Sequence, residues 1–436
     1  MKAVLIAAPS SGSGKTTITM GILRAMRNMG LDVCAFKTGP DYIDRAFLER
    51  ACRGRAGNLD MHLQGRKGML SALALASAEY CVLEGAMGYF DGIHNTYENS
   101  SYDISRELGI STILVYTPGG EMFSAIPKLK GMAEFGASGI EAVIFNNVSE
   151  RYYRLLKEAL EKHTDLKALG YLPKIDSAEL KSRHLGLVQS IELEDLEERI
   201  DELAERVKAT IDLDGIIQMM RDTPYGEKPE IGKYDIKVAV ARDKAFSFYY
   251  TENLDILEKI CRVSYFSPLE DRRLPQCDLL YLGGGYPEIF KRGLATNGTM
   301  LDSIREYSRK GGHVYSECGG FMYLTGGIDG EEMAGVFPGD SRMTGSLQNF
   351  GYVDIVLRQD CMLGSKGDRI TAHEFHRSVS EVRSDTIFEI SKTMDGRTWE
   401  GGYLYKNTYG GYPHISFLGN LKILKNILDS VEREKR

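Results

Sequence analysis

The chain has 436 residues, more than one typical hydrophobic core holds, so we expect two domains. A formal net charge of −7 argues against a nucleic-acid-binding protein. No run approaches the roughly 18 apolar residues of a membrane helix, and the first residues lead straight into an apolar strand without room for a signal peptide. The seven cysteines are scattered and form no CxxC pair, which favours reduced thiols in a cytoplasmic protein.

Short apolar runs alternate with helical segments in the first half of the chain. We predict strands at residues 3–8, 33–37, 81–84, 112–116 and 142–146. We predict helices at residues 15–28, 102–108 and 152–162. This alternation is typical of a doubly wound parallel α/β sheet. A later stretch rich in Glu and Leu, residues 191–208, predicts a solvated surface helix.

A segment rich in proline and glycine, residues 223–235, interrupts the pattern and is the best linker candidate. Beyond it the pattern restarts, with strands expected at 236–241, 263–266, 279–282 and 314–316 and helices near 249–260 and 300–308. The restart predicts a second α/β domain. We therefore expect a first domain over 1–222 and a second over 236–436.

A glycine-rich turn, Ser-Ser-Gly-Ser-Gly-Lys-Thr-Thr at residues 10–17, lies between the first predicted strand and the first predicted helix. A phosphate-binding loop needs backbone N–H groups that no side chain covers, which Gly12 and Gly14 provide. Lys15 is expected to reach the β- and γ-phosphates and Thr16 to bind Mg²⁺. The strict pattern has glycine where Pro9 stands, so this is a variant loop. The predicted nucleotide contacts are Gly12, Ser13, Gly14, Lys15, Thr16 and Thr17.

Acidic residues follow the next two predicted strands. Asp41 and Asp44 lie three residues apart in a turn, where such a pair holds Mg²⁺ or positions a substrate; a helix N-cap is the alternative for Asp44. Glu84 ends the strand 81–84, a position typical of a magnesium partner, and Asp91 follows in a glycine-rich loop.

These positions give a set of predicted roles at the nucleotide site. Asp44, Glu84 and Asp91 are the predicted catalytic residues, and Asp41 and Tyr42 are expected to bind substrate. Asn146, at the end of a later strand, is expected to face the adenine, with a turn cap as the alternative. The predicted metal ligands are Thr16, Asp41 and Glu84.

Cys318 stands between a short apolar strand and two glycines, the setting of an exposed nucleophile at the start of a helix, where the dipole favours a thiolate. A nucleophilic cysteine needs a base, and His414 is the chosen histidine. Ser416 stands where many amidases carry a glutamate, so the third member of the site stays open. Gly284 and Gly285 are expected to bind substrate through their backbone N–H groups as an oxyanion hole.

The run His373-Glu374-Phe375-His376 resembles a metal cluster at first sight. It lacks a third ligand and the helical HExxH spacing of zinc proteases, so a polar hairpin beside a cleft between the domains is the preferred interpretation.

Taken together, these stretches resemble the cobyrinic acid a,c-diamide synthase family. The matching stretches are 10–17, 36–44, 58–60, 84–92, 283–288, 316–320, 372–378 and His414. The resemblance implies a first domain similar to dethiobiotin synthetase and a second similar to class I glutamine amidotransferases. It implies ATP and Mg²⁺ as cofactors, cobyrinic acid and L-glutamine as substrates, and a Cys318–His414 glutaminase pair.

The expected reaction is activation of a tetrapyrrole carboxylate as an acyl phosphate, followed by displacement of phosphate by ammonia released from glutamine and passed between the domains. Nickel-sirohydrochlorin and hydrogenobyrinic acid are alternative substrates. A ParA-like ATPase switch is the alternative from another class, although it leaves Cys318 and His414 without a purpose. No membrane or nucleic-acid partner is expected, and a homodimer is left open.

Overall fold

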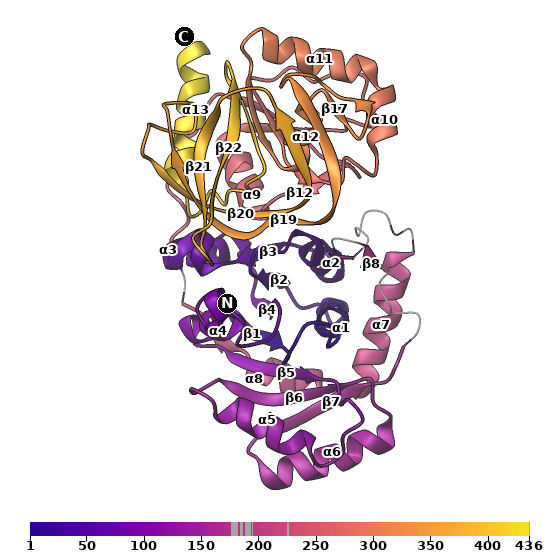
Figure 1. Cartoon of the computed structure of the whole chain (residues 1–436). Coiled ribbons are helices and arrows are strands. Elements are labelled where there is room, and N and C mark those ends of the chain that lie inside the picture. The colour runs from indigo at the N-terminus through magenta and orange to yellow at the C-terminus, as the bar shows by residue number, and fades with distance from the viewer. Residues whose placement is uncertain (176–181, 184–185, 188–192, 194, 225, 436) are drawn as a thin grey trace. The chain divides into compact units, whose positions relative to one another are not determined.

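The computed structural model describes residues 1–175, 182–183, 186–187, 193, 195–224 and 226–435. The chain divides into two compact units, Met1–Lys228 and Pro229–Arg436, which we call the first and second units (Figure 1). Among the described residues no helix combines the length and the hydropathy that crossing a membrane requires.

The first unit is built on a sheet in the order β3-β2-β4-β1-β5-β6-β7, whose neighbours all run parallel. A short strand, β10, adds antiparallel to β1. The bounds are β1 (Lys2–Ala7), β2 (Val33–Thr38), β3 (Ala56–Leu59), β4 (Tyr80–Glu84), β5 (Ser111–Tyr116), β6 (Ile140–Asn146), β7 (Lys167–Leu172) and β10 (Arg221–Asp222), with a separate pair β8 (Ser182–Arg183) and β9 (Gly186–Leu187). The predicted doubly wound parallel sheet is confirmed.

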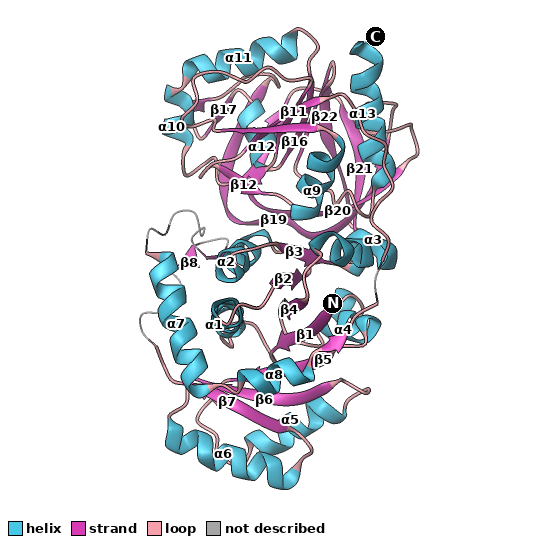
Figure 2. Cartoon of the chain, turned by 180° about the vertical axis from the view of Figure 1, so that it is seen from behind, coloured by secondary structure: helices cyan, strands magenta, loops and turns pink. Residues whose placement is uncertain are grey.

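Helices cover both faces of this sheet, with α1 and α2 on one side and α3 and α4 on the other (Figures 1 and 2). The helices are α1 (Lys15–Asn28), α2 (Tyr42–Cys52), α3 (Met61–Ala76), α4 (Ser101–Leu108), α5 (Ala125–Glu134), α6 (Glu150–His163), α7 (Leu196–Thr210) and α8 (Leu213–Met219), with a 3₁₀ turn at Ile93–Asn95. Because every parallel strand ends at the same edge, the loops after β1, β2 and β4 meet there.

The helix expected at 191–208 is α7, with residues 191, 192 and 194 outside the described part of the chain. The expectation that it is simply solvated is wrong. Its Leu203 and Val207 pack so closely on α1 that a Cβ at Gly21 would stand 2.5 Å from Val207. Arg24 of α1 is fully buried, and its guanidinium pairs with Glu197 of α7 at 2.7 Å.

Within one sheet of the second unit a run of parallel strands is followed by a mostly antiparallel part. The parallel strands are, in order, β13 (Arg262–Phe266), β11 (Lys237–Ala241), β14 (Leu279–Leu282), β16 (His313–Glu317) and β23 (Thr408–Gly411). The sheet continues through β22 (Thr398–Tyr405), β21 (Thr386–Lys392), β19 (Gly339–Leu357), β17 (Gly327–Ile328) and β18 (Glu331–Glu332), and β20 (Arg369–Val382) pairs with β19. A separate pair joins β12 (Phe246–Phe248) to β15 (Gly284–Gly285).

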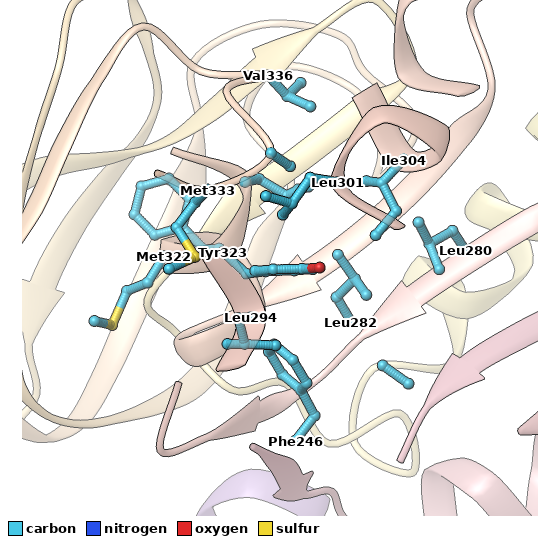
Figure 3. Packing of buried hydrophobic residues seen from close by; sticks show 14 of the residues in the cluster. Phe246, Leu280, Leu282, Leu294, Leu301, Ile304, Met322, Tyr323, Met333 and Val336 are labelled. Carbon is cyan, nitrogen blue, oxygen red and sulfur yellow. The ribbon is translucent and has the colours of Figure 1, made fainter. Parts of the chain in front are cut away.

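The helices of the second unit are α9 (Thr251–Ile260), α10 (Lys291–Thr296), α11 (Gly298–Arg309), α12 (Gly319–Leu324) and α13 (Leu421–Lys435). The short helix α12 is anchored in a buried apolar cluster, where Tyr323 is fully buried and points toward side chains of β14 and α11 (Figure 3). The ring of Phe246 approaches that of Tyr323 with centroids 5.2 Å apart. This packing fixes the element that begins directly after Cys318.

Residues of the predicted linker 223–235 bond to the unit that each belongs to. The Thr223 N–H donates to the Met1 carbonyl, and the Ser71 hydroxyl donates to the Glu227 carbonyl in the first unit. In the second unit the Tyr234 hydroxyl donates to Asp429. The segment is therefore held at both ends.

Candidate active sites

The glycine-rich turn after β1 has the backbone of a phosphate-binding loop. Gly12 and Gly14 have φ values of 77° and 84°, the left-handed region that favours glycine. A Cβ at Gly14 would stand 2.2 Å from Nδ2 of Asn146, so any other residue there would displace this amide. The same Asn146 amide donates to the Ser13 carbonyl at 3.1 Å, which ties the loop to the end of β6.

Lys15 is buried at the start of α1, and its ammonium is held by the loops around it. Its Nζ donates to the carbonyl oxygens of Ser10 at 3.1 Å and Met87 at 2.6 Å. Burial, with the nearby charge of Lys37, lowers the pKa of Lys15 to about 8. A phosphate would bind this ammonium more strongly than the two neutral carbonyl oxygens do.

Two carboxylates, a lysine and a threonine meet where β2 and β4 end and α1 and α2 begin. Lys37 Nζ lies 2.9 Å from Asp44 Oδ2 and 2.6 Å from Glu84 Oε1. The Thr16 hydroxyl donates to the same Glu84 oxygen at 2.6 Å and lies 3.4 Å from Asp44 Oδ2. The predicted Thr16, Asp44 and Glu84 therefore come together, with Lys37 at their centre.

The charges in this cluster stabilise one another. Burial raises the pKa of Glu84 despite its pairing with Lys37. Burial acts in the same direction on Asp44, but the charge and hydrogen bond of Lys37 outweigh it and lower the pKa of Asp44. The two carboxylates likewise outweigh burial at Lys37 and raise the pKa of this lysine. Lys37 is therefore a fixed positive charge beside the phosphate loop.

Asp41 caps helix α2, the role offered as the alternative for Asp44. Its Oδ1 accepts from the backbone N–H groups of Ile43 and Asp44, both at 3.0 Å. Burial and the neighbouring Asp44 charge raise the pKa of Asp41 to about 7. Tyr42 is buried at the first position of the same helix.

Asp91 lies apart from these contacts in the loop after β4. Its Oδ2 accepts from the Gly88 N–H at 2.9 Å, and its side chain is exposed. A Cβ at Gly88 would stand 2.5 Å from this oxygen, so the turn depends on glycine. The carboxylate thus closes a turn beside the phosphate loop.

A cavity of about 590 Å³ opens over the cluster, and its described lining residues belong to the first unit. The predicted residues that line it are Gly12, Gly14, Lys15, Thr16, Thr17, Asp41, Asp44, Glu84 and Asn146. Lys37 also lines it, whereas Ser13, Tyr42 and Asp91 do not belong to the lining among the described residues. The size suits a small organic ligand with several phosphates.

In the second unit Cys318 stands at a sharp turn between β16 and α12. Its backbone has φ 47° and ψ −104°, which is strained for a residue with a side chain. The Cys318 N–H donates to the Gly411 carbonyl at 2.7 Å, and its own carbonyl accepts the first bond of α12, from Met322. The predicted strand–cysteine–helix turn is present, but the expected exposure of the cysteine is wrong, since only 5% of Cys318 is exposed.

Burial acts against the thiolate that is expected at this helix start. Burial raises the pKa of the Cys318 thiol, and the Glu288 carboxylate adds to the effect, while a backbone N–H at Gly319 opposes it only in part. Since α12 has only six residues, its dipole is small. The thiol therefore needs a base to lose its proton.

His414 is buried just beyond β23, in a backbone bridge with His373 of β20. Its ring lies against the glycine loop, since a Cβ at Gly284 would stand 2.5 Å from His414 Cε1 and 3.2 Å from Nε2. The position of a Cβ at Gly319, next to Cys318, is 3.0 Å from the Gly285 nitrogen. The glycine loop thus adjoins both the imidazole and the residue after the cysteine.

The glycine loop offers fewer backbone donors than its sequence suggests. The Gly283 N–H donates to the Tyr249 hydroxyl at 2.9 Å, and the Tyr286 N–H donates to the Ala245 carbonyl at 3.0 Å. An oxyanion hole at Gly284 and Gly285 stays a prediction.

A carboxylate lies close to the imidazole of His414. The Nδ1 atom of His414 is 3.7 Å from Oε2 of Glu317, the residue directly before Cys318. Both side chains are buried, with 1% of each exposed. Sequence analysis left the third member of this site open, because the partner is distant from His414 in sequence.

Comparisons with known proteins find relatives of both parts of the chain. Residues 4–188 match the CobQ/CobB/MinD/ParA nucleotide binding domain, and residues 237–421 match the CobB/CobQ-like glutamine amidotransferase domain. The cobyrinate a,c-diamide synthase of Clostridium tetani is 42% identical over 98% of this chain and 100% of its own length. Those of Clostridium acetobutylicum and Listeria monocytogenes are each 40% identical, over 98% and 99% of this chain and all of their own lengths.

The chain belongs to the cobyrinate a,c-diamide synthase family. The resemblance drawn from the motifs is confirmed, as are the glutamine-hydrolysing ligase class and the nucleotide-binding first domain. A ParA-like switch gives no account of the amidotransferase domain over residues 237–421.

The chemistry of the first-unit site fits the magnesium expected in this family. Glu84 Oε2 is buried and has no hydrogen-bond partner among the residues that the structure describes. A divalent cation prefers carboxylate and hydroxyl oxygens, which this atom and Thr16 Oγ1 supply. Asp44 is the carboxylate that approaches Thr16, whereas Asp41 is engaged as a helix cap.

The run His373-Glu374-Phe375-His376 lies on β20, which pairs antiparallel with β19. His376 stacks on Tyr412 with ring centroids 3.7 Å apart, and its Nε2 lies 3.1 Å from Glu374 Oε2. Within the described part of the chain no three His, Cys, Asp or Glu side chains are grouped as a metal site would need. His373, Glu374 and His376 are therefore buried polar residues of the second unit.

Lys37 is a member of the charged cluster of the first unit that sequence analysis missed. A signal for it exists, since Lys37 is a lysine at the end of a short apolar strand, and a buried lysine requires a carboxylate partner.

Proposed function

We propose that the chain is an ATP- and glutamine-dependent ligase that amidates the a and c acetate carboxylates of cobyrinic acid in cobalamin biosynthesis. What supports this most is one coincidence: a phosphate loop whose Thr16 contacts the buried Glu84 and the half-buried Asp44 occurs in the same chain as Cys318 and His414, which are both buried in the second unit. Since ATP and glutamine are cytoplasmic metabolites, we place the reaction in the cytoplasm.

In the first half-reaction an oxygen of the tetrapyrrole carboxylate attacks the γ-phosphorus of ATP. The bond from this phosphorus to the β-phosphate oxygen breaks, ADP departs, and an acyl phosphate remains. The protein's share is positioning and neutralisation of charge. The loop N–H groups at Gly12 and Gly14 hold the phosphates, with Lys15 and Lys37 as cations. Thr16, Glu84 and Asp44 would hold Mg²⁺, which when bound would neutralise phosphate charge; Asp41 remains a predicted ligand.

In the second half-reaction Cys318 attacks the side-chain amide carbon of glutamine. The thiol proton passes to His414, which then protonates the leaving nitrogen, so that ammonia departs and a thioester remains. Water hydrolyses the thioester to glutamate and restores the thiol. Ammonia attacks the acyl phosphate, and phosphate leaves.

The test is to incubate the purified chain with ATP, Mg²⁺ and glutamine and one of three macrocycles: cobyrinic acid, nickel-sirohydrochlorin or hydrogenobyrinic acid. The expected result is a cobyrinic acid product in which two OH groups are replaced by NH₂, read by mass, with equal ADP and glutamate formed. Product from another macrocycle alone would reassign the substrate. Glutamate release without any amidated macrocycle would contradict the ligase.

A further inference from the structure

The glutaminase site contains a buried acid that neither the motifs nor the family comparison assign. In many amidases a glutamate two residues after the histidine orients the imidazole, and here that position is Ser416. Glu317 instead precedes the nucleophile itself, at the end of β16, where it pairs in register with Gly411 of β23. The chain therefore brings a carboxylate to His414 from the neighbouring strand.

Glu317 is held by three donors. Its Oε1 accepts from the Tyr315 hydroxyl at 2.6 Å and from the Ile415 N–H at 3.0 Å. Its Oε2 accepts from the Tyr281 hydroxyl at 3.2 Å. Burial, followed by the charge of Glu317, raises the pKa of both tyrosines well above the usual value, so they donate throughout the working pH range. Acceptor-only bonding on both oxygens is the pattern of an ionised carboxylate.

The two edges of the imidazole face different groups. Nδ1 lies 3.7 Å from Glu317 Oε2, while Cε1 and Nε2 face the glycine loop, whose Gly285 adjoins the start of α12. An acid on the Nδ1 side fixes that nitrogen as the donor and leaves Nε2 as the base, as the aspartate does in serine proteases. The contact is longer than a hydrogen bond, and such contacts tighten when the charged state forms.

We propose that Glu317 is the positioning residue of the glutaminase: it orients His414 through Nδ1 and stabilises the imidazolium formed when Cys318 gives up its proton. The inference rests on the proposed glutamine hydrolysis. The proton moves only from the sulfur to Nε2 and then to the leaving nitrogen, and Glu317 stays ionised throughout. Since burial raises the pKa of the Cys318 thiol, the paired histidine carries the deprotonation.

The test is Glu317→Gln in the full chain, with Glu434→Gln as the matched control. Glu434 is 56% exposed and lies 3.8 Å from Nδ1 of His313 in the same unit, so its replacement removes a Glu–His contact outside the site. We expect glutaminase kcat to fall on the order of 10²- to 10⁴-fold in Glu317→Gln, with KM for glutamine little changed and Glu434→Gln active. Glu317→Asp keeps the charge and is expected to retain more activity than Glu317→Gln.

Two further readouts separate orientation from structural damage. Synthesis driven by ammonium instead of glutamine should persist in Glu317→Gln, and the acidic limb of its kcat/KM profile should move to lower pH because the imidazolium loses its neighbouring anion. The charge of Glu317 contributes to the raised pKa of the Cys318 thiol. Removing it would by itself ease thiol ionisation, so a fall in rate points to the histidine.

A Glu317→Gln variant with normal glutaminase kcat, or one no slower than Glu434→Gln, would overturn the inference while leaving the proposed function intact. Loss of ammonium-dependent synthesis together with glutaminase would also count against a positioning role. Absence of glutaminase in the unmodified chain, by contrast, would overturn the proposed function itself.

Discussion

Burial lowers the pKa of Lys15, and a solution experiment can detect this. With a pKa of about 8, lowered by burial and by Lys37, part of its population is neutral in mildly alkaline solution. A bound phosphate favours the charged form and raises this pKa, so nucleotide binding must draw a proton from solution.

We predict net proton uptake when a non-hydrolysable magnesium–ATP analogue binds at about pH 9, and little uptake at about pH 7, where Lys15 is already charged. The measurement is calorimetric titration in two buffers of different ionisation enthalpy. Lys310→Ala, which removes an exposed lysine of the second unit, should leave the uptake unchanged. Equal heats in both buffers at the higher pH would show that Lys15 does not titrate at the site.

At the scale of elements, local signals predicted the strands and helices that carry the chemistry. Helix α1 starts directly after the glycine turn and ends at Asn28, as predicted, and β14 matches its predicted range 279–282. Helices α2 and α3 were not predicted. The N-cap of α2 is Asp41, for which the sequence predicts a metal ligand. Helix α3 is interrupted at Gly65, whose φ of 62° breaks the helical periodicity.

The two site residues that sequence analysis missed share a cause. Lys37 and Glu317 act across strand pairs, and the register of those pairs is set by the whole sheet. Lys37 pairs in register with Glu84, and Glu317 with Gly411, over separations of 47 and 94 residues by subtraction of their numbers. A single sequence shows where each strand ends but not which strand pairs with it. The motifs therefore indicate the two sites but not the charged residues, Lys37 and Glu317, that lie beside them.

The close packing of Gly284 of β15 against the His414 ring leads to a prediction. Gly284→Ala should displace the His414 ring, because the new Cβ would stand 2.5 Å from Cε1. We expect glutaminase activity to fall at least about tenfold, as misplaced catalytic groups cost, while ammonium-dependent synthesis continues. Gly298→Ala is the control, since a Cβ there meets nothing within 4 Å. Equal activity of the two variants would mean that the ring and loop are not packed in this way in solution.

For the whole molecule, the two chemistries use separate sets of residues. The described residues that line the cavity around the phosphate loop belong to the first unit, and Cys318, Glu317 and His414 all belong to the second. The coupling between them in the proposed reaction is a small neutral molecule, ammonia, that the second site makes and the first consumes. An external supply of that molecule should therefore replace the second site.

This separation predicts the behaviour of Cys318→Ala. The variant should lose glutamine-dependent synthesis, because no other residue takes the place of the nucleophile, yet it should amidate the macrocycle with ATP and a high concentration of ammonium at a near-normal rate. Product mass and ADP release measure both activities. Cys361→Ala, which removes another thiol of the same unit, should keep both. A folded Cys318→Ala protein that ammonium cannot rescue would mean that the thiol also acts in carboxylate activation, and the division of labour between the units would be wrong.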